Sequence, residues 1–171
     1  MPGCELHLQG AAEMSLKQQI ERALERAAFH GAAPTTLSVT EDGVRFEADV
    51  VHVERLACAF SRMEVVNAAW ATAPLAKVKQ VADQLSSRLT YLLEPIRTIE
   101  VDAESCTVQL RSNPPQVGDD ATSYYELEAR GGGSLRLQRF EKTAGEPRRP
   151  VQIEVTREVF RRLVDDFAAA N

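Results

Sequence analysis

An Asp-Gly pair at 42–43 stands between two stretches in which apolar residues alternate with polar ones. Alternation with a period of two is typical of a half-buried strand, and Asp-Gly is a preferred pair for a type I′ turn. Counting outward from a two-residue turn places the apolar residues of both strands on one face. The sequence therefore predicts an antiparallel hairpin over 36–50, with the pairs Glu41–Val44, Val39–Phe46 and Leu37–Ala48.

The stretch 74–95 carries apolar residues at helical spacing, with charged and polar residues mostly between them. Pro74 suits the first turn of a helix, because its missing N–H has no partner there. Pro95 disfavours helical geometry at Glu94. We expect one amphipathic helix over this stretch, burying the stripe formed by Leu75, Val78, Val81, Ala82, Leu85, Leu89, Leu92 and Leu93.

Two further helices are expected near the ends of the chain. Ser15 and Gln18 match a capping box that begins a helix over 16–30, and Gly31 stands where a left-handed C-terminal cap is needed. Thr156 is positioned to cap the last helix. The apolar face predicted for that helix comprises Val159, Phe160, Leu163, Val164 and Phe167.

The remaining strands follow from alternation and from turn residues. A turn or bulge near His52 precedes a third strand that begins at Leu56, with Trp70 expected against the core. Two more hairpins are predicted over 99–111 and 124–138, then a polar loop over 142–150 and a strand over 151–155.

The turns between strands are too short for parallel crossovers, so the sheet must be antiparallel. The sequence thus predicts a single α+β domain over 15–171, after a flexible N-terminal lead-in over 1–14. The domain has seven to eight strands and three helices in the order α-βββ-α-ββββ(β)-α, with the helices on one face.

Composition limits the classes of partner. The chain has 171 residues and a net charge of −5, which disfavours nucleic acid and anionic membranes. No apolar run reaches membrane-spanning length, and no signal peptide is evident. Three separated cysteines indicate neither a disulfide framework nor a zinc site, so we expect a cytoplasmic protein.

The search for catalytic chemistry yields no constellation. His52 and Glu54 have the H-x-E spacing of zinc deaminases but lack the accompanying P-C-x-x-C motif. Cys58 and Cys106 fall on the apolar phase of their strands, which favours buried, inert thiols. The glycine run 131–133 opens strand-like sequence, which favours a turn over a phosphate loop. We therefore predict no catalytic residue, cofactor or metal.

The resulting functional hypothesis is a non-enzymatic protein-binding module, an adaptor or a chaperone-like domain, that forms a homodimer. The element order and acidic charge are similar to those of small secretion chaperones, although the extra strands depart from that pattern and no motif residues are shared. The candidate interface residues are Tyr124, Glu126 and Glu128, because the tyrosine projects an aromatic ring onto an otherwise polar strand face.

Two alternatives remain open. A curved sheet covered by helices can leave a cavity, in which an inward-pointing Tyr125 would orient a small ligand. The third hypothesis is an enzyme that uses Cys58 or the strand 124–128.

Overall fold

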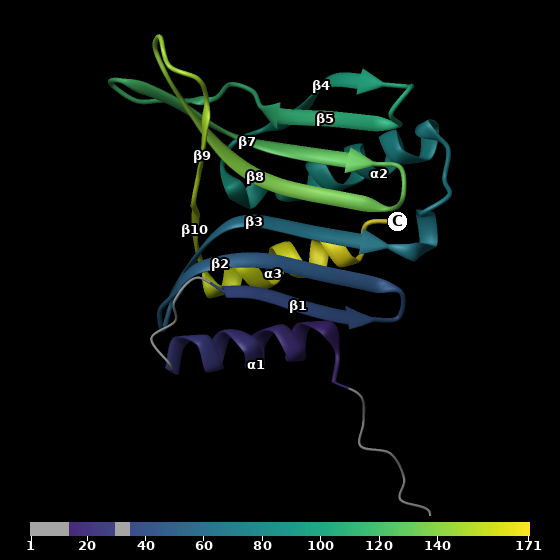
Figure 1. The fold of residues 1–171 in the computed structure, drawn as a ribbon, viewed down its shortest axis with the longest axis vertical. Coiled ribbons are helices and arrows are strands. Elements are labelled where there is room, and N and C mark those ends of the chain that lie inside the picture. Colours follow the sequence, from purple (N-terminus) through teal and green to yellow (C-terminus); the bar gives the residue numbers. More distant parts are fainter. Residues whose placement is uncertain (1–13, 30–34) are drawn as a thin grey trace, which may run out of the picture.

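The structure is a computed structural model that describes residues 14–29 and 35–171 (Figure 1). Within these residues the chain forms three α-helices, α1 (Leu16–Phe29), α2 (Leu75–Arg88) and α3 (Arg157–Ala168), and two short 3₁₀ helices, η1 (Ala68–Trp70) and η2 (Leu89–Leu92). The strands are β1 (Thr35–Glu41), β2 (Val44–Val53), β3 (Ala57–Asn67), β4 (Ile96–Asp102), β5 (Thr107–Ser112), β6 (Gln116–Val117), β7 (Ala121–Arg130), β8 (Ser134–Thr143), β9 (Arg149–Val151) and β10 (Ile153–Thr156).

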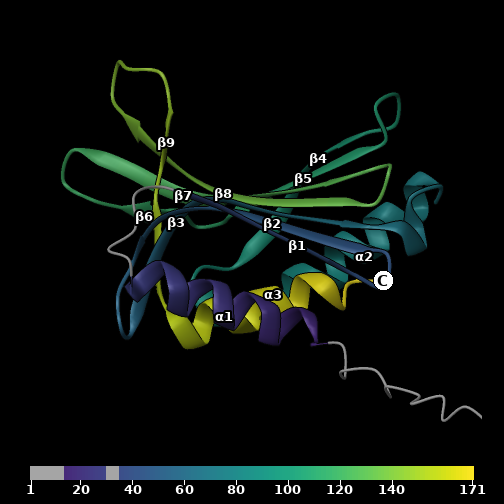
Figure 2. The same cartoon turned by 60° about the horizontal axis from the view of Figure 1, so that its bottom comes forward.

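All described strands belong to one antiparallel sheet, with the spatial order β1-β2-β3-β8-β7-β5-β4. Three short strands lie outside this order and extend the sheet locally. β6 pairs with β7, β9 with β8 and β10 with β3. The helices lie on one face and leave the other, the open face, uncovered (Figure 2). The predicted α+β class, the single domain and the element order are confirmed.

The sheet forks between β3 and β8. These strands pair only through 63–66 and 134–137. Beyond this point the first half of β3 pairs with β10, while the second half of β8 pairs with β9. The segment 149–156 therefore fills the space between two diverging strands. The polar loop predicted over 142–150 is shorter than expected, because backbone pairing with β7 and β9 extends β8 through polar residues.

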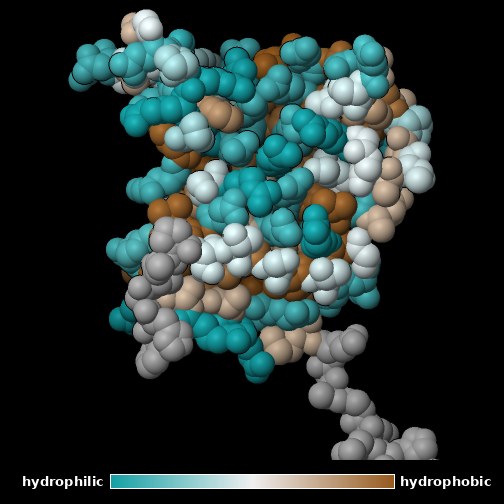
Figure 3. Space-filling view, in the orientation of Figure 1, coloured by the Kyte–Doolittle hydropathy of each residue, from teal (hydrophilic) through white to brown (hydrophobic). Residues whose placement is uncertain are grey.

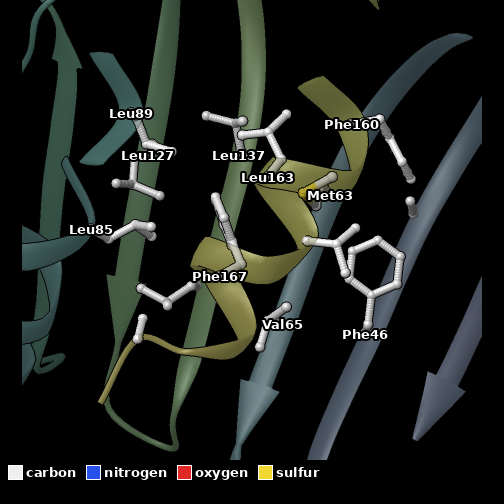
Figure 4. Close-up of a cluster of buried hydrophobic side chains, with 14 of the residues drawn as sticks. Phe46, Met63, Val65, Leu85, Leu89, Leu127, Leu137, Phe160, Leu163 and Phe167 are labelled. Carbon is white, nitrogen blue, oxygen red and sulfur yellow. The ribbon is translucent and has the colours of Figure 1, made fainter. Parts of the chain in front are cut away.

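The core lies between the sheet and the helices (Figure 4). Phe160 of α3 contacts Phe46 and Phe60 edge-on, with ring centroids 6.2 and 5.3 Å apart. Leu85 of α2 is fully buried, and Trp70 is 2% exposed, as expected. Leu56 is 75% exposed, contrary to the apolar phase predicted for it, because β3 begins one residue later, after the turn.

The first hairpin has the predicted register, with Val39 opposite Phe46 and Leu37 opposite Ala48. Asp42 and Gly43 both have positive φ, +48° and +78°, as a type I′ turn requires. Register shifts between Asp49 and His52 confirm the irregularity expected near His52.

The predicted helix caps are confirmed where the structure describes them. Gln18 accepts a hydrogen bond from the Ser15 N–H at 3.0 Å, and the Ser15 hydroxyl accepts one from the Gln18 N–H at 3.4 Å. The Thr156 hydroxyl accepts from the Val159 N–H at 3.1 Å. Gly31 and residues 1–13 of the predicted lead-in lie outside the described residues.

The helix predicted over 74–95 is shorter than expected. It ends at Arg88 and tightens into η2, a form common at helix C-termini. Leu89 and Leu92 stay buried, but Leu93 adopts a left-handed conformation, φ +63°, and is 88% exposed. This reversal, two residues before Pro95, directs Glu94 away from the predicted helix and toward β8.

Candidate functional site

Two neighbouring tyrosines of β7 face opposite sides of the sheet. Tyr125 lies on the helix side of the sheet, in the same row as the buried residues Leu127 and Ala129, whereas Tyr124 lies on the open face. An arginine guanidinium lies over each ring: Arg139 is 4.4 Å from the Tyr125 centroid and Arg111 is 4.6 Å from that of Tyr124. Each tyrosine lines a different cleft, and Pro115 belongs to the lining of both.

The first cleft, here the Tyr125 cleft, has a volume of about 770 Å³ and lies beside the fork of the sheet. Its walls come from the end of η2 and the following link, the loop before β7, the segment 152–155 and the start of α3. The residues that line it are Tyr91, Leu92, Leu93, Glu94, Pro95, Pro114, Pro115, Gln116, Tyr125, Arg139, Gln152, Glu154, Val155 and Val159.

Arg139 occupies a core-facing position at the inner side of this cleft. It continues the alternation of Leu135 and Leu137, both fully buried, and its side chain is only 12% exposed. Its Nη2 donates to Glu94 Oε1 at 2.8 Å and also contacts Gln116 Oε1 and Ser123 Oγ, at 2.8 and 2.9 Å. These three contacts all come from Nη2 and do not use the N–H groups of Nε and Nη1, which keep donor capacity.

Glu94 is also nearly buried, with its side chain 14% exposed. Its Oε2 is buried and has no hydrogen-bond partner in the described part of the chain. Buried carboxylate oxygens normally accept hydrogen bonds, so the pair presents both unused donors and an unused acceptor.

The phenol of Tyr125 completes the polar groups of the cleft. Burial raises its pKa, an effect that the positive charge of Arg139 opposes. The net shift is upward, so the hydroxyl keeps its proton at neutral pH and can donate a hydrogen bond.

The second cleft, here the Tyr124 cleft, lies on the open face and has a volume of about 740 Å³. Its lining residues are Ile99, Arg111, Ser112, Asn113, Pro115, Thr122, Tyr124, Lys142 and Arg148. Tyr124 stacks on Phe140 with centroids 6.1 Å apart, and the Arg148 guanidinium lies 4.2 Å from the Phe140 centroid.

Glu126 links the two arginines of this cleft. It accepts from Arg111 Nη2 at 3.1 Å and also binds Arg148. Burial by itself would raise the pKa of Glu126, but the hydrogen bonds from Arg148 and Arg111 outweigh it and lower the pKa. The carboxylate therefore remains charged and holds both guanidinium groups in place.

The structure brings together two of the three predicted interface residues. Tyr124 is 8% exposed and the Glu126 side chain 11% exposed, both within the arginine cluster just described. Glu128 lies outside that cluster and pairs instead with Arg130 and Arg136, at 3.2 and 3.9 Å. Their contact with a partner stays a prediction.

In the described part of the chain, no hydrogen bond joins Cys58 to His52. Burial raises the pKa of Cys58 to about 11, consistent with an inert thiol. His52 pairs with Glu54 at 2.9 Å on an exposed strand end. In the described ranges, 14–29 and 35–171, no group of three His, Cys, Asp or Glu side chains is arranged to hold a metal ion.

Comparison with known proteins gives no match to a family model, a curated protein or a solved structure. None of the described helices is both long and apolar enough to cross a membrane.

Proposed function

We propose that this protein binds a small organic ligand in the Tyr125 cleft. The observation that carries the proposal is the Arg139–Glu94 pair, a nearly buried ion pair with unused hydrogen-bonding capacity beside a cleft of about 770 Å³. Ligand pockets of this size typically combine apolar walls with a few polar groups that fix orientation.

The walls of the cleft support this proposal. Prolines, tyrosines and aliphatic side chains supply most of the lining. Glu94, Gln116 and Tyr125 contact Arg139. Tyr91 is fixed in position, because its hydroxyl donates to Asp166 at 2.8 Å and Arg162 lies 4.2 Å from its ring centroid. A fixed wall lowers the entropy cost of binding.

The chemistry of the polar groups defines the ligand class. Arg139 and the Tyr125 hydroxyl donate hydrogen bonds and Glu94 Oε2 can accept one, which suits a carbonyl oxygen that adjoins an N–H group, as in an amide. The apolar walls suit an aromatic or aliphatic body. We therefore expect a ligand that joins an oxygen acceptor to an apolar ring or chain.

NMR titration of the full chain with benzamide, phenylacetate and cyclohexanecarboxamide tests the proposal. Binding should shift the side-chain resonances of Gln116 and Gln152, which line the cleft. Val155→Trp should abolish these shifts by filling the cleft, whereas Thr40→Trp, on an exposed edge position of β1, should preserve them. A folded wild-type protein that binds none of the probes, or a Val155→Trp variant that binds them as well as wild type, contradicts the proposal.

A second proposed function, protein binding through self-association, is favoured by the edge strand β4. Every residue of β4 after Ile96 is exposed, including Ile99 at 45% and Val101 at 40%. An unpaired edge offers backbone N–H and C=O groups to another strand. We propose a second copy of this chain as the occupant.

The charges of β4 suit antiparallel pairing with itself. Arg97 and Asp102 lie on one face, since they pair with Arg111 and Thr107, two positions on the same side of β5. Antiparallel pairing about a twofold axis can therefore place Arg97 of one copy opposite Asp102 of the other.

A cytoplasmic location also remains a proposal. It is supported by Cys58 and Cys106, which are free thiols in the described part of the chain. Mass-spectrometric mapping of thiols in protein taken directly from its native cells tests it, and stable oxidation of both residues would argue against a reducing compartment.

A further inference from the structure

We propose that the Tyr124 cleft binds the phosphoryl group of a small anionic ligand. This site lies on the face of the sheet opposite the Tyr125 cleft and does not depend on the function proposed there. The inference begins with the distribution of charge on the open face, which Figure 3 shows to be largely hydrophilic over the strands.

Away from the cleft, the arginines and carboxylates that β2, β3, β7 and β8 carry on the open face are matched in number. Arg62 contacts Asp49 and Glu64, and a chain of ion pairs continues across β8 to β7. Among the described residues, four arginines and four carboxylates take part: Arg45, Arg62, Arg130 and Arg136, with Glu47, Asp49, Glu64 and Glu128. This part of the face needs no further counterion.

Around the Tyr124 cleft, positive side chains outnumber negative ones. Arg111, Lys142 and Arg148 line it, whereas none of the carboxylates in the described ranges does. Glu126, next to the cleft, is shared between Arg111 and Arg148. The site therefore keeps an excess of positive charge in a protein whose net charge is −5.

Arg97, at the near end of the edge strand β4, adds to this excess, whereas Glu100 and Asp102 lie further along that strand, opposite Gln109 and Thr107. Arg97 lies directly opposite Arg111 in the ladder between β4 and β5, and it forms no ion pair with any described residue. Like charges in directly opposed positions destabilise a sheet. A bound anion would relieve that repulsion.

The cationic groups are also held in place before binding. The guanidinium of Arg111 lies over Tyr124 and that of Arg148 over Phe140, and Arg148 Nη1 donates to the Tyr124 hydroxyl at 3.4 Å. Arg111 Nε is buried and has no partner among the described residues. The cleft thus has fixed donors that the protein itself does not fully satisfy.

A phosphoryl group fits this arrangement better than a carboxylate. A phosphate monoester carries nearly two negative charges and three acceptor oxygens, which suit two planar guanidinium forks and one ammonium group. Ile99, also in the lining, offers an apolar contact for the organic part of the ligand. The inferred ligand is therefore a phosphorylated small molecule.

Isothermal titration calorimetry with phenyl phosphate, in phosphate-free buffer of low ionic strength, tests this inference on the full chain. Lys142→Gln and Arg148→Gln should each weaken binding about tenfold, since each removes one charge-assisted contact. Arg149→Gln is the matched control. Arg149 adjoins Arg148 in sequence but pairs with Glu141 and does not line the cleft, so its variant should bind within about twofold of wild type.

Several outcomes would overturn the inference. They are the absence of saturable binding to the wild type, an equal loss in the Arg148 and Arg149 variants, or benzoate binding as tight as that of phenyl phosphate. Lys142→Gln keeps the test valid if the Arg148 variant fails to fold. We expect it to fold normally, because the described contact of the Lys142 side chain is with the backbone oxygen of Glu146. Val155→Trp should leave phenyl phosphate binding unchanged, which separates this site from the Tyr125 cleft.

Discussion

Arg139 is a charged residue at a position that the strand pattern assigns to the core. Its neighbours along the same side of β8, Leu135 and Leu137, are fully buried. Removing a guanidinium from water is costly unless a counterion and hydrogen bonds compensate. Glu94 supplies the counterion and Tyr125 a ring face for the guanidinium, so the charge is tolerated at the edge of the core.

Replacing Arg139 by leucine should lower the free energy of unfolding by about 3 kcal/mol, because it leaves Glu94 nearly buried without its counterion. The double variant Arg139→Leu/Glu94→Leu should recover most of this loss. Arg149→Leu breaks an ion pair whose arginine is 68% exposed and should cost about 1 kcal/mol or less. Urea unfolding measures all three. A double variant no more stable than Arg139→Leu would contradict this account of the pair.

Sequence reasoning identified only part of the Tyr125 cleft. The alternation of β7 predicted that Tyr125 points inward, and the structure places it there. Arg139 was missed, although an arginine in step with Leu135 and Leu137 is a readable signal of a buried charge. The sequence predicts Glu94 at a helix end, and its pairing with Arg139 depends on a chain reversal at Leu93 that periodicity cannot reveal.

At the scale of elements, α2 shows why the apolar stripe is a stronger signal than helix length. Val78, Val81, Ala82 and Leu85 are all fully buried, at the spacing read from the sequence. The α-helix ends earlier than predicted, because the chain continues as the 3₁₀ helix η2. This tighter helix still buries Leu89 and Leu92, so the same apolar stripe is compatible with both helix types. Short strands such as β9 were missed for a related reason: they pair through backbone atoms, and side-chain alternation carries little information about them.

Leu85→Ala tests the position of α2 in the core. Leu85 is fully buried, so its truncation should lower the free energy of unfolding by about 2–5 kcal/mol through lost burial and a residual cavity. Ser87→Ala, on the exposed side of the same helix, should change it by less than about 0.5 kcal/mol. The comparison is made by denaturant unfolding monitored by circular dichroism. A nearly neutral Leu85→Ala would mean that α2 is peripheral.

At the scale of the whole molecule, the fork of the sheet and the placement of all three helices on one face determine which surfaces are open to solvent. The sheet forks where β3 and β8 cease to pair, so that β3 continues against β10 and β8 against β9, and the Tyr125 cleft lies beside this point. The sequence predicted the antiparallel sheet and its covered face from turns and alternation. It did not predict the fork, because the order β3-β8 joins strands far apart in the chain, and local patterns do not encode such pairing.

The two outer strands of the sheet differ in their surroundings. α1 packs against β1, and the Leu16 N–H donates to a carboxylate oxygen of Glu41. β4 has no strand on its outer side in the described part of the chain, and its side chains after Ile96 are exposed. Self-association through a strand edge is therefore expected at β4 rather than at β1.

Sedimentation equilibrium over a wide concentration range should detect a species of twice the 18.9 kDa chain mass. Val101→Lys should shift the equilibrium toward the monomer, because it places a lysine ammonium group on the pairing edge, where strand addition would desolvate it. Thr40→Lys makes the same kind of change at an exposed position of β1 and should leave association unaltered. A dimer that resists Val101→Lys but is weakened by Tyr124→Ala would place the interface on the open face instead, at the predicted residues Tyr124, Glu126 and Glu128. A single species at the chain mass, even at the highest concentration, would exclude both interfaces and leave a monomeric ligand-binding protein.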